Sequence, residues 1–155
     1  MTLGSLRTCA QHIVSDAQAL KDKHVVEQKD APVNYACVFA QSDGEYEALL
    51  QEAQELGKIV KNTKMGPVFL VEPIETVAGP LRLVKIRKPD PERTERGDAD
   101  FTVADYPTFK TSVLGKPGYK LIDRPDMEMI ELADPEFDVL AYFSHPILIE
   151  TLGIK

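Results

Sequence analysis

Charged side chains recur at alternate positions in two segments of this sequence that are predicted to be strands. Lys85 and Arg87 share one face of the first segment, and Asp98 and Asp100 share one face of the second. Such a basic pair can hold a small anion, whereas neighbouring carboxylates can hold a proton or a hard cation. Two interpretations stay open. The basic pair either binds an anionic ligand or forms an internal salt bridge with the two acids, because a partly buried charge needs a partner.

Three further polar side chains are candidate contacts for a ligand: Tyr35, Glu72 and Tyr142. Tyr35 interrupts the apolar segment VNYACVFA, where a buried hydroxyl needs a hydrogen-bond partner. The alternative is that Tyr35 is a core aromatic residue. In the ligand-binding interpretation, Lys85 and Arg87 supply cationic contacts, while Tyr35 and Asp100 orient polar groups of the ligand.

Several well-known types of site have no support in the sequence. Glycine-rich nucleotide-binding motifs and the G-x-S-x-G motif are absent. The two cysteines, Cys9 and Cys37, have no zinc-site spacing, and Cys37 is expected to be a small core residue. His145, between a serine and a proline, is predicted to be a loop residue. The sequence therefore assigns no catalytic residue.

The composition is that of a folded acidic protein. Of the 155 residues, 43% are hydrophobic and 28% are charged, and the formal net charge is −7. These values exclude a disordered chain, and the absence of a long apolar run excludes an integral membrane protein. The net negative charge is unsuited to general nucleic-acid binding. Because the first 25 residues lack a signal-peptide apolar region, we expect a cytoplasmic protein with reduced thiols.

The residues that could do chemistry are positioned by a pattern of elements that occurs twice. A helical region over residues 3–28 comes first, with apolar side chains three and four residues apart. The first half then comprises a strand over 33–40, a helix opened by Ser42 and ended by Gly57, and strands over 58–62, 68–72 and 81–87. The second half comprises a strand over 98–103, a helix capped by Asp105, and strands over 119–123, 127–132 and 137–143.

The order strand–helix–strand–strand–strand over 33–87 and again over 98–143 predicts an α+β fold. Two βαβββ modules side by side form a cupped mixed sheet with helices outside and a concave pocket inside. We expect an N-terminal helical segment over residues 1–32 and a single domain over residues 33–155.

This order of elements resembles the vicinal-oxygen-chelate superfamily, which includes glyoxalases, extradiol dioxygenases and bleomycin-resistance proteins. The resemblance covers residues 33–143 and depends on VNYACVF, FLVEPIETVAGPLRLVKIRKPDP, RGDADFTV and MEMIELADPEFDVLAYF. The second stretch and the last two look most similar to a YecM-like branch without an assigned activity.

The resemblance also implies where a metal centre would lie. In the metal-dependent members, four ligands converge from the first and last strands of both modules. Those places correspond to Tyr35, Asp100, Lys85 and Ala141, or to Asn34, Ile86 and Tyr142 where the register shifts by one residue. Lysine carries no acceptor and alanine carries no donor atom, so neither set is a ligand set for a transition metal. We therefore expect no transition metal and no other cofactor.

Three functions follow as expectations. The first is a metal-independent domain that binds a small anionic metabolite in the concavity of the sheet. The second is an isomerase or lyase of the same superfamily that holds a divalent metal on Asp98, Asp100, Glu72 and Glu131. The third is an interaction module that forms a homodimer through sheet edges or the N-terminal helix.

Overall fold

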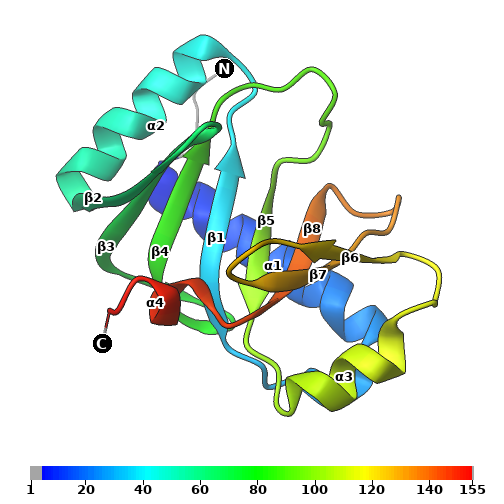
Figure 1. Ribbon diagram of the computed structural model, residues 1–155. Helices are drawn as coiled ribbons and strands as arrows, with labels where there is room; N and C mark the ends of the chain where they lie inside the picture. The colour runs from blue at the N-terminus through cyan, green and yellow to red at the C-terminus, as the bar shows by residue number, and fades with distance from the viewer. Residues whose placement is uncertain (1–4, 155) are drawn as a thin grey trace.

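The computed structural model describes residues 5–154, which build one open eight-stranded sheet and the helices that pack on it (Figure 1). The strands are β1 (Val33–Phe39), β2 (Gly57–Thr63), β3 (Gly66–Thr76), β4 (Gly79–Arg87), β5 (Gly97–Phe101), β6 (Tyr119–Asp123), β7 (Glu128–Leu132) and β8 (Val139–His145). The helices are α1 (Leu6–His24), α2 (Asp43–Leu56), α3 (Tyr106–Val113) and α4 (Leu148–Thr151), and a 3-10 turn, η1 (Val26–Gln28), follows α1.

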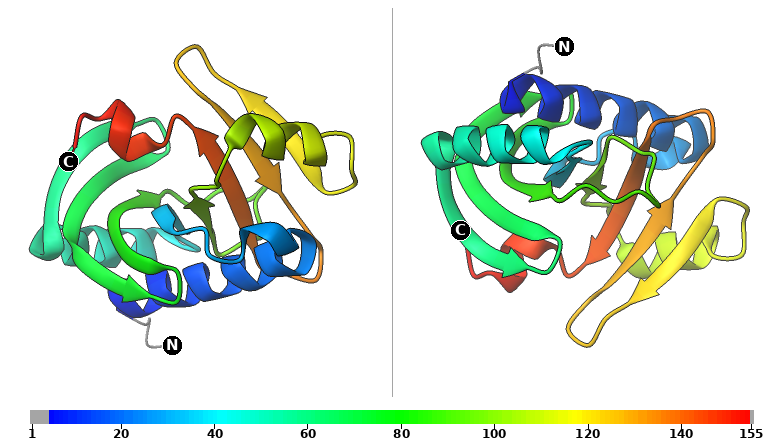
Figure 2. Two further views of the ribbon diagram at one scale, coloured as in Figure 1. Left: turned by 90° about the horizontal axis from the view of Figure 1, so that it is seen from below. Right: turned by 90° about the horizontal axis from the view of Figure 1, so that it is seen from above.

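The sheet joins two βαβββ modules through their first strands. Its order is β2-β3-β4-β1-β5-β8-β7-β6. Within each module the first and last strands pair in parallel, β1 with β4 and β5 with β8, while β1 and β5 pair antiparallel at the centre. The α+β fold predicted from the order of elements is confirmed, including the N-terminal helix that precedes the sheet. Figure 2 shows how the sheet curls so that one face is concave.

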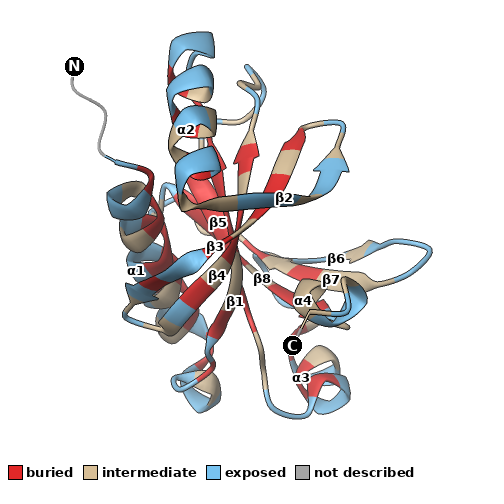
Figure 3. Ribbon diagram, turned by 90° about the vertical axis from the view of Figure 1, so that its left-hand side faces the viewer, coloured by how far each residue is buried: buried red, intermediate tan, exposed pale blue. Residues whose placement is uncertain are grey.

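Helix α1 covers the outer face of the sheet. Ser5 caps it by accepting a hydrogen bond from the backbone N–H of Thr8. Its buried stripe comprises Leu6, Ala10, Ile13, Val14, Ala17 and Leu20. These side chains belong to the same core cluster as the outward side chains of β1, β5 and β8, so the apolar stripe of α1 is used within the chain (Figure 3). The helical region predicted from residue 3 ends as a helix at His24, and residues 3 and 4 lie outside the described residues.

The helix caps read from the sequence form as expected. The Ser42 hydroxyl accepts from the N–H of Glu45, and the Glu45 side chain accepts from the N–H of Gln41 at 2.7 Å. Asp105 caps α3 by accepting from the N–H of Thr108. Gly57 stands at the end of α2 in an extended conformation, because β2 begins at that residue.

Two segments differ from the sequence prediction. Strand β3 continues to Thr76 and forms a tight hairpin with β4, whereas a loop was expected between residues 72 and 81. The last residues, expected to be a loose turn or a short helix, form α4, which contacts β1 on the concave side of the sheet (Figure 3). Among the helices of residues 5–154, none is both long and apolar enough to cross a membrane.

Candidate functional site

The register of the central strands brings the candidate residues to the concave face. Tyr35 is opposite Asp100 across β1 and β5, and Cys37 is opposite both Asp98 on β5 and Lys85 on β4. Alternate residues of these strands point outward into the core between the sheet and α1. These five side chains therefore follow the period of two along their strands.

A pocket of about 360 Å³ opens on this face, and it is called the central pocket below. Three cationic side chains and two acidic ones lie on its wall: Lys61, Lys85, Arg124, Asp100 and Asp126. Its remaining lining residues are Tyr35, Thr63, Val68, Pro125, Met127, Met129, Ser144, Pro146, Leu148 and Thr151. The lining thus combines apolar side chains with an excess of cationic groups, which suits an amphipathic anion.

Asp100 is a buried carboxylate that the fold supplies with donors. It accepts hydrogen bonds from the backbone N–H of Ser144 at 3.1 Å, from the Ser144 hydroxyl, and from the Asn34 side-chain amide at 3.2 Å. Burial raises the pKa of Asp100 to about 6, and these hydrogen bonds oppose the rise because they favour the ionised form. Asp100 is therefore mostly ionised at neutral pH.

Asp98 is buried without that support. Its Oδ1 atom has no hydrogen-bond partner among the described residues, and no hydrogen bond to its other carboxyl oxygen forms there either. Burial first, and then the negative charge of Asp100, raise the pKa of Asp98 to about 8, while Lys85 and Arg87 lower it. At neutral pH the pair therefore holds one proton, mainly on Asp98.

Lys85 lies on the pocket wall without a bonded partner. It makes no hydrogen bond or ion pair with any residue in the described part of the chain. Arg87 pairs with Asp90, at 2.9 Å between Nη2 and Oδ2, and not with either buried aspartate. The internal salt bridge weighed as an alternative for the basic pair does not form. A lysine in a pocket with its ammonium group unpaired is available to an anion.

Tyr35 presents an unpaired hydroxyl to the same pocket. Its ring is half-buried, and its hydroxyl forms no hydrogen bond within residues 5–154. Burial raises the pKa of Tyr35 well above its usual value, as does the negative charge nearby on Asp98 and Asp100. The neutral phenol can donate a hydrogen bond to a bound ligand or accept one from it.

Tyr142 lies on the concave face but outside the lining of the central pocket. It is opposite both Asp100 on β5 and Glu131 on β7, and its hydroxyl donates to Glu131 Oε2 at 2.9 Å. Burial and the charge of Asp98 raise the pKa of Tyr142. Arg93 approaches the same Glu131 oxygen at 4.0 Å. Because its hydroxyl is already bonded, Tyr142 supports the wall of the site without facing into the pocket.

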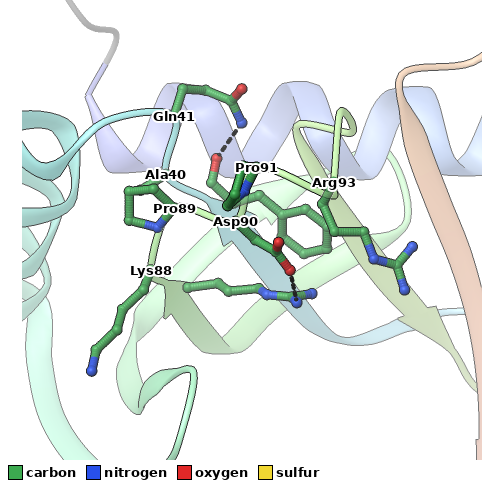
Figure 4. A pocket seen from close by; sticks show the side chains of 9 residues that line it. Ala40, Gln41, Lys88, Pro89, Asp90, Pro91 and Arg93 are labelled. Carbon is green, nitrogen blue, oxygen red and sulfur yellow. Dashed lines mark hydrogen bonds and ion pairs between the residues drawn. The ribbon is translucent and has the colours of Figure 1, made fainter.

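Arg87 belongs to a second hollow of about 260 Å³, lined by Phe39, Ala40, Gln41, Arg93 and residues 87–91. Its guanidinium lies 4.8 Å from the centre of the Phe39 ring and is held there by Asp90. Figure 4 shows Lys88 and Arg93 extending to opposite sides of this second hollow. Lys88 and Arg93 point away from each other, and Arg87 is paired with Asp90. The three cationic groups of this hollow therefore do not converge on one bound anion. Lys85 and Arg87, which the sequence groups as one basic pair, therefore line different hollows.

Glu72 is also separate from the central pocket. It is exposed on β3 and lines a shallow depression with Leu56, Gly57, Lys58 and Arg82 at the edge of the sheet. Glu72, a candidate ligand contact in the sequence, therefore does not join Tyr35 and Asp100 in the central pocket. The register shift between Leu70 and Ile74 changes which side chains of β3 face the pocket beyond Val68.

The positions that the resemblance marks as metal slots carry side chains that do not form a ligand set for a transition metal. Tyr35, Asp100, Lys85 and Tyr142 take the concave positions, while Ile86 and Ala141 are fully buried in the outer core. Asn34 lies in the bulge at the start of β1 and bonds to Asp100. Within residues 5–154, no three histidine, cysteine or acidic side chains come together as ligands for a metal ion.

Sequence reasoning missed most of the lining of the central pocket, including Lys61, Arg124, Ser144 and Leu148. Lys61 and Arg124 come from edge hairpins whose positions depend on how the sheet curls. Ser144 bonds to Asp100 from 44 residues away, and Leu148 on α4 lines the pocket. Of these, only Ser144 had a signal in the sequence: it lies two residues after Tyr142, in the alternating pattern of β8.

Comparison with a solved structure supports the fold of this chain. The sequence matches no known protein family and no curated protein. A solved structure described as "Structural Genomics, Protein EC4020" is similar to this chain, with a TM-score of 0.64 and 14% sequence identity over 98% of this chain and 96% of that one. At this identity the likeness shows that the two chains share a fold, and nothing beyond the fold follows.

Proposed function

We propose that this protein is a vicinal-oxygen-chelate-like domain that binds a small anionic metabolite in the concavity of its sheet, without a transition metal. The observation that carries the proposal is Lys85, which lines the central pocket and has no bonded partner within the described residues. The paired βαβββ modules joined through β1 and β5 support the resemblance to the superfamily.

The pocket suits an anion that also carries an apolar group. Lys61 and Arg124 add positive charge at the rim, and both side chains are exposed. Met127, Met129 and Leu148 give the pocket an apolar wall. A carboxylate held by Lys85 would place its apolar part against this wall, and the Tyr35 hydroxyl would orient a second polar group.

Benzoate is a suitable first probe because it joins a carboxylate to a flat apolar ring. We expect benzoate to raise the melting temperature at pH 7 and to shift the amide NMR signals of β1, β4 and β5. Benzyl alcohol, which has the ring without the charge, should do neither at the same concentration. A ligand that binds only the native state stabilises it in proportion to its occupancy.

A matched pair of lysine variants assigns the effect. Lys85→Met keeps the length of the side chain and removes its charge, so it should weaken benzoate binding at least tenfold. Lys120→Met removes an exposed lysine of β6 outside the pocket and should leave binding unchanged. The proposal fails if benzoate does not bind, or if the two variants bind benzoate equally well.

A further inference from the structure

Two buried carboxylates, Asp98 and Asp100, lie close to Lys85, which is the partly buried lysine of the central pocket. The protonation of these carboxylates sets the charge that an incoming anion meets. We propose that binding of a small carboxylate at Lys85 is coupled to the proton held by the Asp98–Asp100 pair, so that the anion binds with uptake of a proton wherever the pair has lost it. This inference deepens the proposed function and rests on it.

The geometry of the pair carries the inference. Asp98 and Asp100 are two residues apart on β5, point to the same concave face, and are 7% and 4% exposed. Asp100 accepts three hydrogen bonds, whereas Asp98 accepts none from the residues that the structure describes. A buried ionised carboxylate without donors or a bonded counter-ion is costly, so Asp98 is the member of the pair that keeps the proton.

The other titratable groups that face Asp98 do not change the assignment of the proton to Asp98. Tyr35 and Cys37 on β1 and Tyr142 on β8 have raised pKa values and stay neutral. The remaining groups are charged: Lys85 and Arg87 on β4, Asp100 on β5, and Glu131 on β7.

Some of these charged groups are paired with other side chains, and others are not. Arg87 is committed to Asp90, and Glu131 is bonded to Tyr142 and close to Arg93. Lys85 is therefore the cation left to balance the pair. With one proton on the pair, Lys85 faces a single negative charge. Once Asp98 ionises, Lys85 faces two negative charges, and the net negative charge around it opposes an incoming anion.

The coupling has a defined sign. An anion placed at Lys85 adds negative charge beside Asp98, which makes loss of the Asp98 proton still less favourable. Binding is therefore strongest where Asp98 is protonated, and it requires proton uptake at a pH where Asp98 has ionised. Because the pKa of Asp98 lies at about 8, affinity should change little between pH 6.5 and 7.5 and should fall about tenfold per pH unit above pH 8.

Isothermal calorimetry with benzoate measures both quantities. Titrations at pH 7 and pH 9, each in two buffers with different ionisation enthalpies, give the dissociation constant and the number of protons bound per benzoate. We expect close to zero protons at pH 7 and close to one at pH 9, with weaker binding at pH 9.

Variants identify the proton carrier. Asp98→Asn has no proton to exchange, so benzoate affinity should become independent of pH between 7 and 9 and proton uptake should vanish. Asp123→Asn removes an exposed acid of β6 outside the pocket and should keep the wild-type pH dependence. Circular dichroism spectra of both variants establish that they are folded under the conditions of the titration.

A measurement without ligand keeps the inference testable on its own. Carbon-13 NMR of aspartate carboxyls, assigned by Asp98→Asn, should show one carboxyl that titrates near pH 8. A titration of Asp98 below pH 5 overturns the inference. So does benzoate binding that depends on Lys85 but is equally tight at pH 7 and pH 9; the proposed function would then survive. Absence of benzoate binding at every pH overturns both.

Discussion

Ser144 on β8 donates two hydrogen bonds to Asp100 on β5, one from its backbone N–H at 3.1 Å and one from its hydroxyl. Both residues are buried, and the parallel pairing of β5 with β8 sets their relative position. Ionised acceptors make stronger hydrogen bonds than neutral ones, so this contact both orients Asp100 and favours its charged form. The ionisation of Asp100 in the central pocket therefore depends on how β8 packs beside β5 in the second module.

Replacement of Ser144 by alanine tests that contact. Ser144→Ala removes the hydroxyl donor and keeps the backbone donor, so the pKa of Asp100 should rise above its value of about 6. The free energy of unfolding at pH 8 should fall by about 1–3 kcal/mol, because an ionised carboxylate loses a donor in a buried setting. Carboxyl NMR and urea denaturation measure the two effects. An unchanged Asp100 titration would contradict the role given to the hydroxyl.

Asp98 should make the protein less stable as the pH rises. Its pKa is raised from 3.8 in the unfolded chain to about 8 in the fold, so the native state keeps a proton that the unfolded state has released. The stabilisation by that proton is fully present below about pH 4 and is lost progressively up to about pH 8, with a slope of up to about 1.4 kcal/mol per pH unit.

Asp98→Asn removes this dependence. The variant should gain stability relative to wild type between pH 5 and pH 8, and the difference should level off above pH 8. Urea denaturation at pH 5, 6.5, 8 and 9 measures it, with Asp123→Asn as the exposed control. A difference that stays constant over that range would show that Asp98 is ionised throughout.

Much of the fold could be predicted because its signals are local. The apolar stripe of α1, the Ser42 and Asp105 caps, and the alternation in β5 each depend on residues a few positions apart. The repeated order of elements then limits the topology to a paired sheet. What local signals cannot give is the bulge between Leu70 and Ile74, because it depends on how β3 follows the curl of β4.

The site was harder to predict for the same reason. Alternation groups the side chains of a strand by face, since it needs only the period of the strand, and the structure has Tyr35, Lys85 and Asp100 on one face. Alternation could not separate Lys85 from Arg87, which share a face but line different hollows. That separation comes from Asp90 in the following loop, which holds the Arg87 guanidinium, and loop geometry is not encoded in periodicity.

Asp134 should protect the protein against unfolding in mild acid. Its carboxylate bonds to Lys23 Nζ and His24 Nε2, both at 2.8 Å, and to the backbone N–H of Glu136, which ties the end of α1 to the loop before β8. The Lys23 hydrogen bond, foremost among these, lowers the pKa of Asp134. A lowered pKa gives stability that is present above about pH 4 and is lost as the pH falls below it.

Asp134→Asn should therefore lower the melting temperature at pH 6, and the difference from wild type should shrink between pH 4 and pH 2. Glu136→Gln is the matched control, because Glu136 also pairs with Lys23 but its side chain is 75% exposed. Its effect should be smaller at every pH. Equal effects of the two variants at pH 6 would show that the hydrogen bonds of Asp134 stabilise the protein no more than the exposed Lys23–Glu136 ion pair does.

Gly97 allows α1 to approach the centre of the sheet. A Cβ at this position would lie 2.2 Å from the carbonyl oxygen of Cys37 and 2.7 Å from Cδ1 of Ile13 on α1. A backbone oxygen cannot move aside as a side chain can, so Gly97→Ala should reduce the free energy of unfolding by about 3 kcal/mol, the upper end for overpacking. Gly44→Ala, at an open position of α2, is the control and should be neutral or stabilising. A tolerated Gly97→Ala would mean that β1 and β5 are spaced more widely here.

We expect Arg87 to contribute to stability and Lys85 to contribute to ligand binding. Arg87→Met removes the cation that stacks on Phe39 and pairs with Asp90, so it should cost about 1 kcal/mol of stability and change benzoate affinity at pH 7 by less than about twofold. Lys85→Met should leave the stability unchanged, because Lys85 has no bonded partner to lose within the described residues, and it should weaken benzoate binding. Thermal denaturation and calorimetry on the same two samples test both halves. If Arg87→Met weakens benzoate as much as Lys85→Met does, the two hollows act as one site, and the ligand extends across the Cys37–Asp98 pair between them.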